Sequence, residues 1–362
     1  MTTTMKLHKI ALIGCGVSGT ILLLKLLESV QPEDICVIDP AFDGGDLARH
    51  WSEVNSNTTW GQFLDATDKL ILAKSVVDKK RTKYDPNSIT PVYELSKTLN
   101  QALSLHLHKV DANTCYAKTA DFDTKTGIWT IKMESPGCLG IRYANTVLYA
   151  PGGVPKQVNL SKPQIPLEVV LDSSRLARAV EPGMHILLFG LAHSGILALK
   201  NLLALGTQVS AIYQTNTPFV FARDGAYKGI KQDAAIFADE LLANPSNFVT
   251  FIKSKDAENT IRAYNKCDAI VSAIGFNKNT NTCAFSVDAV HIGVSEYDSQ
   301  TGSIKNATRL FGFGIAYAST SIYEGNIYED AGVPSFVDHA IKIVPGILGV
   351  EPVQTTEENS IT

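Results

Sequence analysis

The sequence predicts an α/β fold with two Rossmann-like, three-layer domains and a small antiparallel β-meander. The main observation is a strand, a glycine-rich turn and an apolar helix, which occur together twice. The first copy spans 9–19 (KIALIGCGVSG) and the second spans 185–195 (HILLFGLAHSG). A further apolar strand follows each helix, at 35–39 and at 208–213. Because one such unit binds one dinucleotide, the repetition predicts two dinucleotides in one chain.

The glycines of the first copy have separate roles. Gly14 permits the tight turn from strand to helix, Gly16 lets the backbone approach a pyrophosphate, and Gly19 lets helix and strand pack closely. The pyrophosphate would lie at the helix N-terminus, where free N–H groups and the helix dipole favour an anion. Val17 and Ser18, in the first turn of this helix, belong to the same candidate site.

The acid that should follow such a motif is Asp39. It ends the second strand about twenty residues after the glycines, where its carboxylate can accept hydrogen bonds from an adenosine ribose. The alternative is a tight glycine turn that binds no ligand. The strand before the turn, the helix after it and the acid at the end of the next strand favour the binding site.

Composition is that of an ordinary globular protein. The chain has 362 residues, of which 45% are hydrophobic and 19% charged, and its net charge is −4. The length fits two or three domains. The basic run at 78–83 is typical of a solvated surface, so nucleic-acid binding has little support. Gly, Lys or His interrupts the apolar stretches at 10–24 and 186–205, and no membrane span is predicted.

The six cysteines are scattered without metal-ligand spacing, at positions 15, 36, 115, 138, 267 and 283. This pattern predicts small packing residues in a reducing, cytoplasmic setting and no metal site. A disulfide reductase of this fold class needs a redox-active pair spaced C-x-x-C or C-x-x-x-x-C, and the chain has none. No Ser/His/Asp hydrolase motif appears either, so the chemistry should depend on a cofactor.

The order of the elements predicts that one domain is inserted into the other, with crossovers near 151 and 275. The outer domain would comprise 1–152 and 268–350, the inserted domain 156–265, and 351–362 a disordered tail. Periodicity predicts helices at 91–103 and near 335–344, and strands at 105–110, 114–118, 127–133, 146–149, 268–275 and 310–316.

Together these motifs resemble the flavoproteins with two dinucleotide-binding domains, in particular the branch of flavin-containing, Baeyer–Villiger and N-hydroxylating monooxygenases. Gly44-Gly45 followed by Trp51 loosely matches that branch's G-G-x-W loop, and 56–58 (Ser-Asn-Thr) its S-N-T segment. Other matches are the hinge at 149–153 with Ala150 and Gly152, the second glycine motif with Gly190, Ser194 and Gly195, and a second hinge with Gly275. Near Gly314 the usual G-D pair is missing.

The resemblance implies FAD in the outer domain and NADPH in the inserted one. Gly45, Trp51, Asn57 and Thr58 would lie near the flavin, and Asn57 would act on the oxygen species or on the retained nicotinamide. A polar turn is the alternative for Asn57. His193 would face a phosphate at the second helix N-terminus, or would be a packing residue.

The choice of NADPH over NADH rests on the strand at 208–213. It ends without an acid that would grip a 2′-hydroxyl, and Arg223 downstream would suit a 2′-phosphate. The alternative is that Arg223 is an ordinary exposed residue.

The predicted function is an FAD-dependent oxidoreductase that uses NADPH to reduce its flavin. The resemblance implies a monooxygenase that inserts one oxygen atom into a nucleophilic nitrogen or sulfur of a small molecule. One alternative is an NADPH-dependent flavin or ferredoxin-type reductase without oxygenation. Another is a non-catalytic redox sensor that binds flavin or nucleotide. The oligomeric state stays open, a homodimer included.

Overall fold

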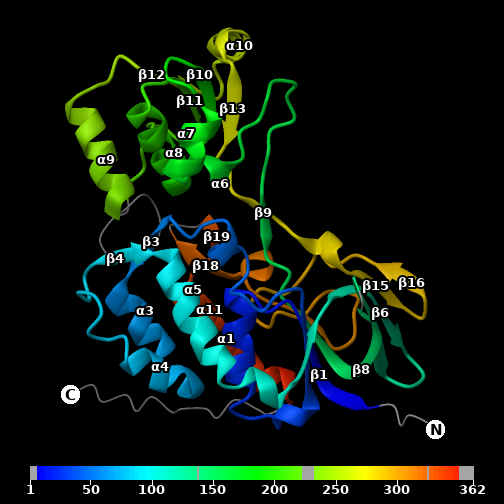
Figure 1. The fold of residues 1–362 in the computed structure, drawn as a ribbon. Coiled ribbons are helices and arrows are strands. Elements are labelled where there is room, and N and C mark those ends of the chain that lie inside the picture. The colour runs from blue at the N-terminus through cyan, green and yellow to red at the C-terminus, as the bar shows by residue number, and fades with distance from the viewer. Residues whose placement is uncertain (1–5, 137, 222–231, 324–325, 350–362) are drawn as a thin grey trace, which may run out of the picture.

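Two sheets organise the protein. The computed structural model describes residues 6–136, 138–221, 232–323 and 326–349. A nine-stranded sheet occupies the lower part of Figure 1, and a four-stranded sheet lies above it. The predicted α/β fold with two Rossmann-like units and a meander is confirmed.

The lower sheet has the strand order β16-β15-β6-β7-β8-β1-β2-β5, and β17 pairs with β8 outside this path. Its strands are β1 (Leu7–Ile13), β2 (Ile35–Asp39), β5 (Asp111–Thr114), β6 (Tyr116–Asp123), β7 (Ile128–Ser135), β8 (Cys138–Tyr149), β15 (Ala284–Val287), β16 (Val290–Ile292) and β17 (Leu310–Gly312). The first half of β8 pairs antiparallel with β7, and its second half runs parallel to β17. Strand β8 therefore joins the meander to the parallel part of the sheet.

Helices cover the parallel part of this sheet on the face seen in Figure 1. They are α1 (Val17–Leu26), α3 (Trp60–Thr67), α4 (Lys74–Asp78), α5 (Val92–Ser104) and α11 (Val333–Ile347). A core of buried aliphatic side chains, among them Leu12, Ile21, Leu95 and Val337, fills the space between the sheet and these helices. A second core, around Trp129, lies on the opposite face beneath the meander.

Shorter elements complete this unit. They are α2 (Asp46–Arg49), β3 (Asn55–Thr59), β4 (Ile89–Pro91), β18 (Ser319–Tyr323), β19 (Asn326–Asp330) and the 3-10 helices η1 (Pro32–Asp34), η2 (Ile71–Ala73), η3 (Leu107–Lys109), η4 (Thr280–Thr282) and η5 (Ile315–Tyr317). Thr59 caps α3 with a reciprocal capping box: its hydroxyl accepts from the Gln62 amide, and its own amide donates to Gln62 Oε1.

The upper sheet is entirely parallel, with the order β12-β11-β10-β13. Its strands are β10 (His185–Phe189), β11 (Gln208–Tyr213), β12 (Val249–Lys253) and β13 (Ala269–Ser272), and its helices are α6 (Leu167–Val170), α7 (Ser173–Ala179), α8 (His193–Ala204), α9 (Gln232–Ala243) and α10 (Ala257–Lys266). The chain enters this unit through β9 (Gly153–Pro155) and leaves it through β14 (Phe276–Lys278), and these strands pair antiparallel. The domain boundaries proposed from the sequence stay a prediction.

Three strand predictions are wrong in detail. The one at 310–316 is too long, since β17 ends at Gly312 and η5 begins at Ile315. Residues 105–110 contain η3 rather than a strand, because Leu105 continues the helical backbone of α5 and the alternating Leu-His pattern is divided between the helix end and a tight turn. The predicted strand at 114–118 is split, since β5 ends at Thr114 and β6 begins at Tyr116.

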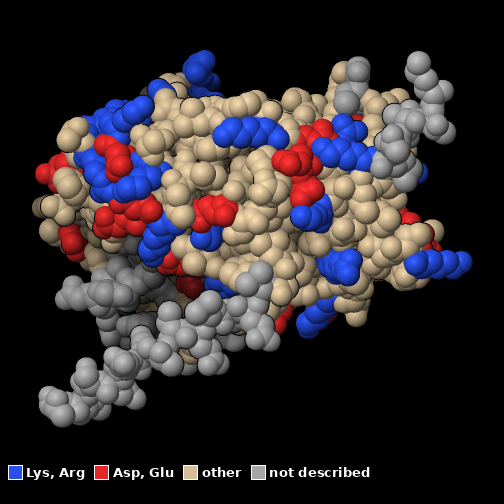
Figure 2. Space-filling view, turned by 90° about the horizontal axis from the view of Figure 1, so that it is seen from below, with Lys and Arg blue, Asp and Glu red and all other residues tan. Residues whose placement is uncertain are grey.

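The surface carries charges of both signs. On the face shown in Figure 2, Lys and Arg side chains lie interspersed with Asp and Glu. Among the described residues, no helix combines the length and the apolar character needed to cross a membrane.

His339 should make stability fall in mild acid. It is 3% exposed on α11, stacks on Phe313 at 5.3 Å between ring centroids, and has no hydrogen-bond partner for either ring nitrogen among the described residues. Burial lowers its pKa from 6.5 to about 4. The folded protein therefore binds the proton less well than the unfolded chain, so the stabilisation is complete above pH 6.5 and is lost as the pH falls toward 4.

Chemical denaturation of the wild type and of His339→Leu across this pH range measures the effect. We expect the stability of the wild type relative to the variant to fall by about 3 kcal/mol between neutral pH and the acid end. Parallel pH profiles for the two proteins would contradict this assignment.

Candidate functional site

The two glycine motifs form the same backbone junction. The amide of Gly14 donates to the carbonyl of Ile38 at 2.9 Å, and the amide of Gly190 donates to that of Ile212 at 2.9 Å. Both glycines have positive φ, +91° and +93°. A Cβ on Gly14 would lie 2.2 Å from the Ala150 carbonyl oxygen. In the second copy, a Cβ on Gly190 would lie 2.3 Å from the carbonyl oxygen of Ala273. Only glycine fits either position.

The last glycine of each motif packs helix against strand. A Cβ on Gly19 would lie 2.2 Å from the carbonyl oxygen of Gly14, and one on Gly195 would lie 2.1 Å from that of Gly190. These distances are far shorter than any van der Waals contact, so α1 and α8 could not lie this close to β1 and β10 with a larger residue. Gly19 and Gly195 therefore shape the site without lining it.

The middle position differs between the copies. A Cβ on Gly16 would meet the Cα of Gly45 at 3.5 Å, an ordinary contact, whereas a Cβ on Gly45 would lie 2.8 Å from the Cα of Gly16. The two glycines thus bring the turn before α1 and the loop before α2 together, backbone to backbone. In the second copy Ala192 occupies the equivalent position as the N-cap of α8.

Both helices begin in a way that leaves their N-termini ready for an anion. Gly16 and Ala192, the N-cap residues of α1 and α8, supply no capping side chain, and neither first turn contains an acid. The first N–H groups of a helix need partners, and the helix dipole favours a negative charge beside them. A phosphate group supplies both the acceptor and the charge.

A cavity of about 470 Å³ lies at these N-termini, bordered by both units. The predicted site residues that line it are Gly14, Gly16, Val17, Ser18, Asp39, Gly45, Trp51, Asn57, Thr58, Ala150, Gly152, His193 and Ser194. The structure thus brings residues of both glycine motifs to one cavity.

The other predicted residues lie outside the lining. Gly19, Gly190 and Gly195 have the packing roles described above. A Cβ on Gly314 would lie 2.3 Å from the Ser18 hydroxyl, so this glycine makes room for the first turn of α1. Gly275 has φ +89° at the crossover before β14. Arg223 falls outside the described residues.

Asp39 is held in place by backbone N–H groups. It is buried, its Oδ2 accepts from the amide of Cys15 at 2.7 Å, and its Oδ1 accepts from the amides of Ala41 at 2.9 Å and Phe42 at 2.8 Å. These bonds hold the carboxylate in the cavity wall, and each of its oxygens has lone pairs to accept further donors.

The segment with Asn57 lies on β3, where residues alternate between buried and half-buried. Thr58 is buried, and its amide donates to the Ser56 hydroxyl at 3.0 Å. Asn57 lines the cavity, and its Oδ1 accepts from the hydroxyl of its neighbour Thr58 at 3.4 Å. As a lining residue, Asn57 can offer its amide N–H groups to a ligand in the cavity.

Trp51 lies between the two units. Its ring meets Phe276 of β14 edge to face at 5.7 Å and packs against the core of the upper sheet. Close by in sequence, the side-chain amide of Asn55 donates to the carboxylate of Asp233 on α9 at 2.6 Å. Trp51 therefore lines the cavity and also contacts the core of the upper unit.

Burial controls the chemistry of the cysteines. It raises the pKa of the Cys15 thiol, and the nearby Asp39 carboxylate raises it further, so this thiol stays protonated. Cys115 lines the cavity, and its amide donates to the backbone carbonyl of Asp39 at 3.2 Å. Cys115 is disulfide-bonded. The prediction that the cysteines are reduced packing residues is wrong for Cys115.

Sequence reasoning missed the contribution of α11. Gly332, Val333 and Phe336, in and before its first turn, line the cavity together with Asn279 and Thr282. Gly332 is the N-cap, and proline follows in the first turn. Proline near a helix start is a recognised signal and would have placed the start two residues earlier than the predicted 335.

Comparisons with known proteins agree with this architecture. No family model matches the chain. Monooxygenase AgnR1 of Paecilomyces divaricatus is 26% identical over 389 residues, which cover 92% of this chain and 96% of that protein.

Two solved structures illustrate the range of similar folds. The bacillithiol disulfide reductase Bdr (YpdA) of Bacillus cereus has a TM-score of 0.62 at 13% identity, covering 95% of this chain and 99% of its own. OTEMO in complex with FAD and NADP has a TM-score of 0.61 at 11% identity, covering 94% of this chain and 84% of its own. At these identities the likenesses show a shared fold.

Gly19→Ala should destabilise the protein strongly. The added methyl group would have to displace the Gly14 carbonyl, and overpacking of this kind costs about 1–3 kcal/mol or more. Gly346→Ala is the matched control, because Gly346 also lies in a helix but has nothing within 4 Å of its Cβ position. Thermal unfolding should show a clear drop in Tm for the first variant alone, and equal Tm values would refute the close-packing argument.

Proposed function

We propose that this protein is an FAD-dependent monooxygenase that uses NADPH to reduce its flavin. It transfers one oxygen atom to a nucleophilic nitrogen or sulfur of a small molecule. The observation that supports this most strongly is the single cavity bordered by both glycine motifs. Two dinucleotides bound in such a cavity can meet, which hydride transfer requires.

The residues fit FAD on the side of the lower sheet. Gly16 and Gly45 leave room for a pyrophosphate against two backbones, the uncapped α1 supplies N–H donors, and Asp39 offers its carboxylate to a ribose. Bound flavin would supply hydride acceptance and oxygen activation. In this proposal the outer domain, 1–152 and 268–350, holds FAD.

NADPH is assigned to the inserted domain, 156–265. His193 and Ser194 at the start of α8 line the cavity, and the strand β11 ends without an acid that would repel a 2′-phosphate. Arg223 is the proposed partner of that phosphate.

The oxygenation step is favoured over disulfide reduction by the cysteines. Cys15, Cys36, Cys267 and Cys283 are free and buried. Cys115 is disulfide-bonded and lines the cavity, but it lies beside Asp39, the proposed adenosine end. Apolar side chains of Trp51, Val54, Leu171 and Phe276 line the cavity between the units and would limit access of water. The 26% identity to a monooxygenase is further support.

Asn57 is the proposed hydrogen-bond donor beside the reacting oxygen. With dioxygen and NADPH present, a set of amines and sulfides should contain at least one compound that raises NADPH consumption and appears as an N- or S-oxide by mass spectrometry. Asn57→Ala should keep its flavin but release several-fold more hydrogen peroxide per NADPH, because one donor typically contributes a few kcal/mol to such a step.

Asn87→Ala, at an exposed turn outside the cavity, is the control and should behave as wild type. If every NADPH consumed appears as hydrogen peroxide whatever compound is added, the protein is a reductase and the oxygenation proposal fails.

Gly16→Ala tests the flavin site separately from the fold. Its methyl group would have an ordinary 3.5 Å contact with protein but would enter the cavity where the pyrophosphate is proposed. We expect a near-normal Tm for the apoprotein and at least about a tenfold loss of FAD affinity, which corresponds to 1.4 kcal/mol. Gly293→Ala, with nothing within 4 Å of its Cβ position, should bind FAD normally. Full FAD affinity in Gly16→Ala would place the pyrophosphate elsewhere.

A further inference from the structure

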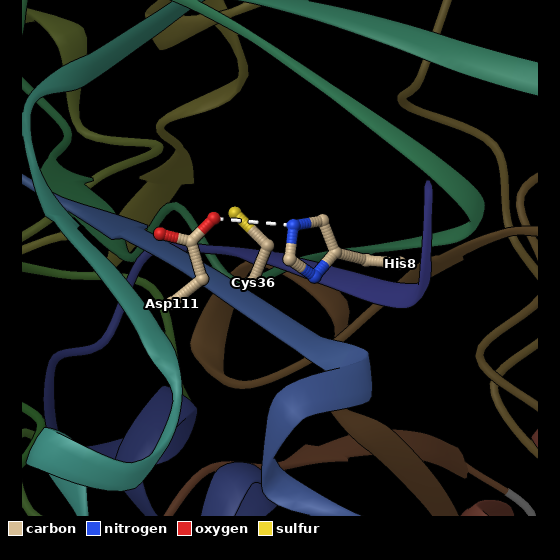
Figure 3. A group of neighbouring side chains, drawn as sticks. All are labelled: His8, Cys36 and Asp111. Atoms are coloured by element: carbon tan, nitrogen blue, oxygen red, sulfur yellow. Dashed lines mark ion pairs between the residues drawn. The ribbon is translucent and has the colours of Figure 1, made fainter. Parts of the chain in front are cut away.

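A second cluster of reactive side chains lies at the other end of the lower sheet. His8, Cys36 and Asp111 stand near the amino ends of β1, β2 and β5, three adjacent parallel strands. Gly14 and Asp39 lie at the carboxyl ends of β1 and β2, so the cluster is separate from the cavity. Figure 3 shows the three side chains converging from their strands.

The geometry suits a small cation. One ligand atom from each residue can be chosen so that all three lie within 4.8 Å of one another. The Nε2 of His8 is 3.1 Å from the Oδ2 of Asp111, an ion-pair contact drawn in Figure 3. Small side-chain rotations would bring the three atoms to the shorter separations of a tetrahedral site.

Burial makes His8 unusual. It is 1% exposed, and neither of its ring nitrogens has a hydrogen-bond partner among the described residues. Its polar neighbour is the Asp111 carboxylate, which makes an ion-pair contact with it, whereas a buried polar group normally also has hydrogen bonds. Cys36 is buried as well, while Asp111 is a quarter exposed and gives access from solvent.

We propose that His8, Cys36 and Asp111 bind a zinc ion. Imidazole, thiolate and carboxylate are the ligands that zinc takes in proteins, and three of them leave the fourth tetrahedral position to water. Binding displaces the thiol proton of Cys36 to solvent. The ion would tie together three strands that are distant in sequence.

Arg142 also binds the carboxylate of Asp111. Its Nε donates to Asp111 Oδ2 at 2.7 Å, and its Nη2 donates to Asn113 Oδ1 at 2.6 Å. The guanidinium therefore competes with a cation for the Asp111 carboxylate. Its side chain is 30% exposed, so it can turn toward solvent when zinc binds.

The test measures zinc in the full-length protein after removal of metals with a chelator. The purified chain is dialysed with zinc, its metal content is measured by mass spectrometry, and its affinity by competition with a chromogenic chelator. We expect one zinc per chain, a rise in Tm with zinc, and at least about a tenfold loss of affinity in Cys36→Ala. Cys283→Ala, which removes another buried free thiol, should leave the affinity unchanged.

Arg142→Gln should bind zinc more tightly than the wild type, since it removes the competing charge. His8→Gln should bind zinc more weakly than the wild type. If His8→Gln does not fold, Cys36→Ala still tests the proposal. No stoichiometric zinc in the wild type, or equal affinity in Cys36→Ala and wild type, would overturn the proposal and leave a structural network of ion pairs.

Discussion

The architecture depends on the contact of two glycines with carbonyl groups across a sheet. At Gly14 the backbone lies so close to Ala150 that no side chain fits between them, and Gly190 repeats the arrangement against Ala273. Ala150 and Ala273 directly follow β8 and β13, the strands after which the chain crosses from one unit to the other. Each contact therefore sets where a helix begins and where the chain changes from one unit to the other. The same close contact therefore determines both the geometry of the binding site and the path of the chain between the units.

The consequence is a shared cavity. Crossover strands β9 and β14 pair with each other, so both units meet at the carboxyl ends of their strands. Trp51 and Asn55, which come from the lower unit, contact Phe276 of the crossover strand β14 and Asp233 of the upper unit. The helices α1 and α8 then direct uncapped N-termini toward the same space. Ligands usually bind outside the carboxyl ends of strands in such sheets, and here two sheets provide that edge together.

Much of this could be predicted from local sequence. The glycine spacing of 14–19 and 190–195 encodes steric requirements that hold wherever the motif occurs, and Asp39 follows at a set distance. The strand at 208–213 was predicted with the bounds of β11. Contacts between distant segments carry no local signal. The role of Trp51 between the units, the disulfide at Cys115 and the cluster of His8 with Cys36 and Asp111 all depend on tertiary placement. The strand predicted at 105–110 failed because a helix end followed by a tight turn can imitate alternation.

The central claim is that one cavity brings a nicotinamide to a flavin. Anaerobic titration of the purified protein with NADPH, followed in the visible spectrum, tests it most directly. The account predicts a bound flavin whose absorbance is bleached by about one equivalent of NADPH, with a markedly weaker response to NADH. A protein that binds no flavin, or a bound flavin that NADPH does not bleach, would contradict it.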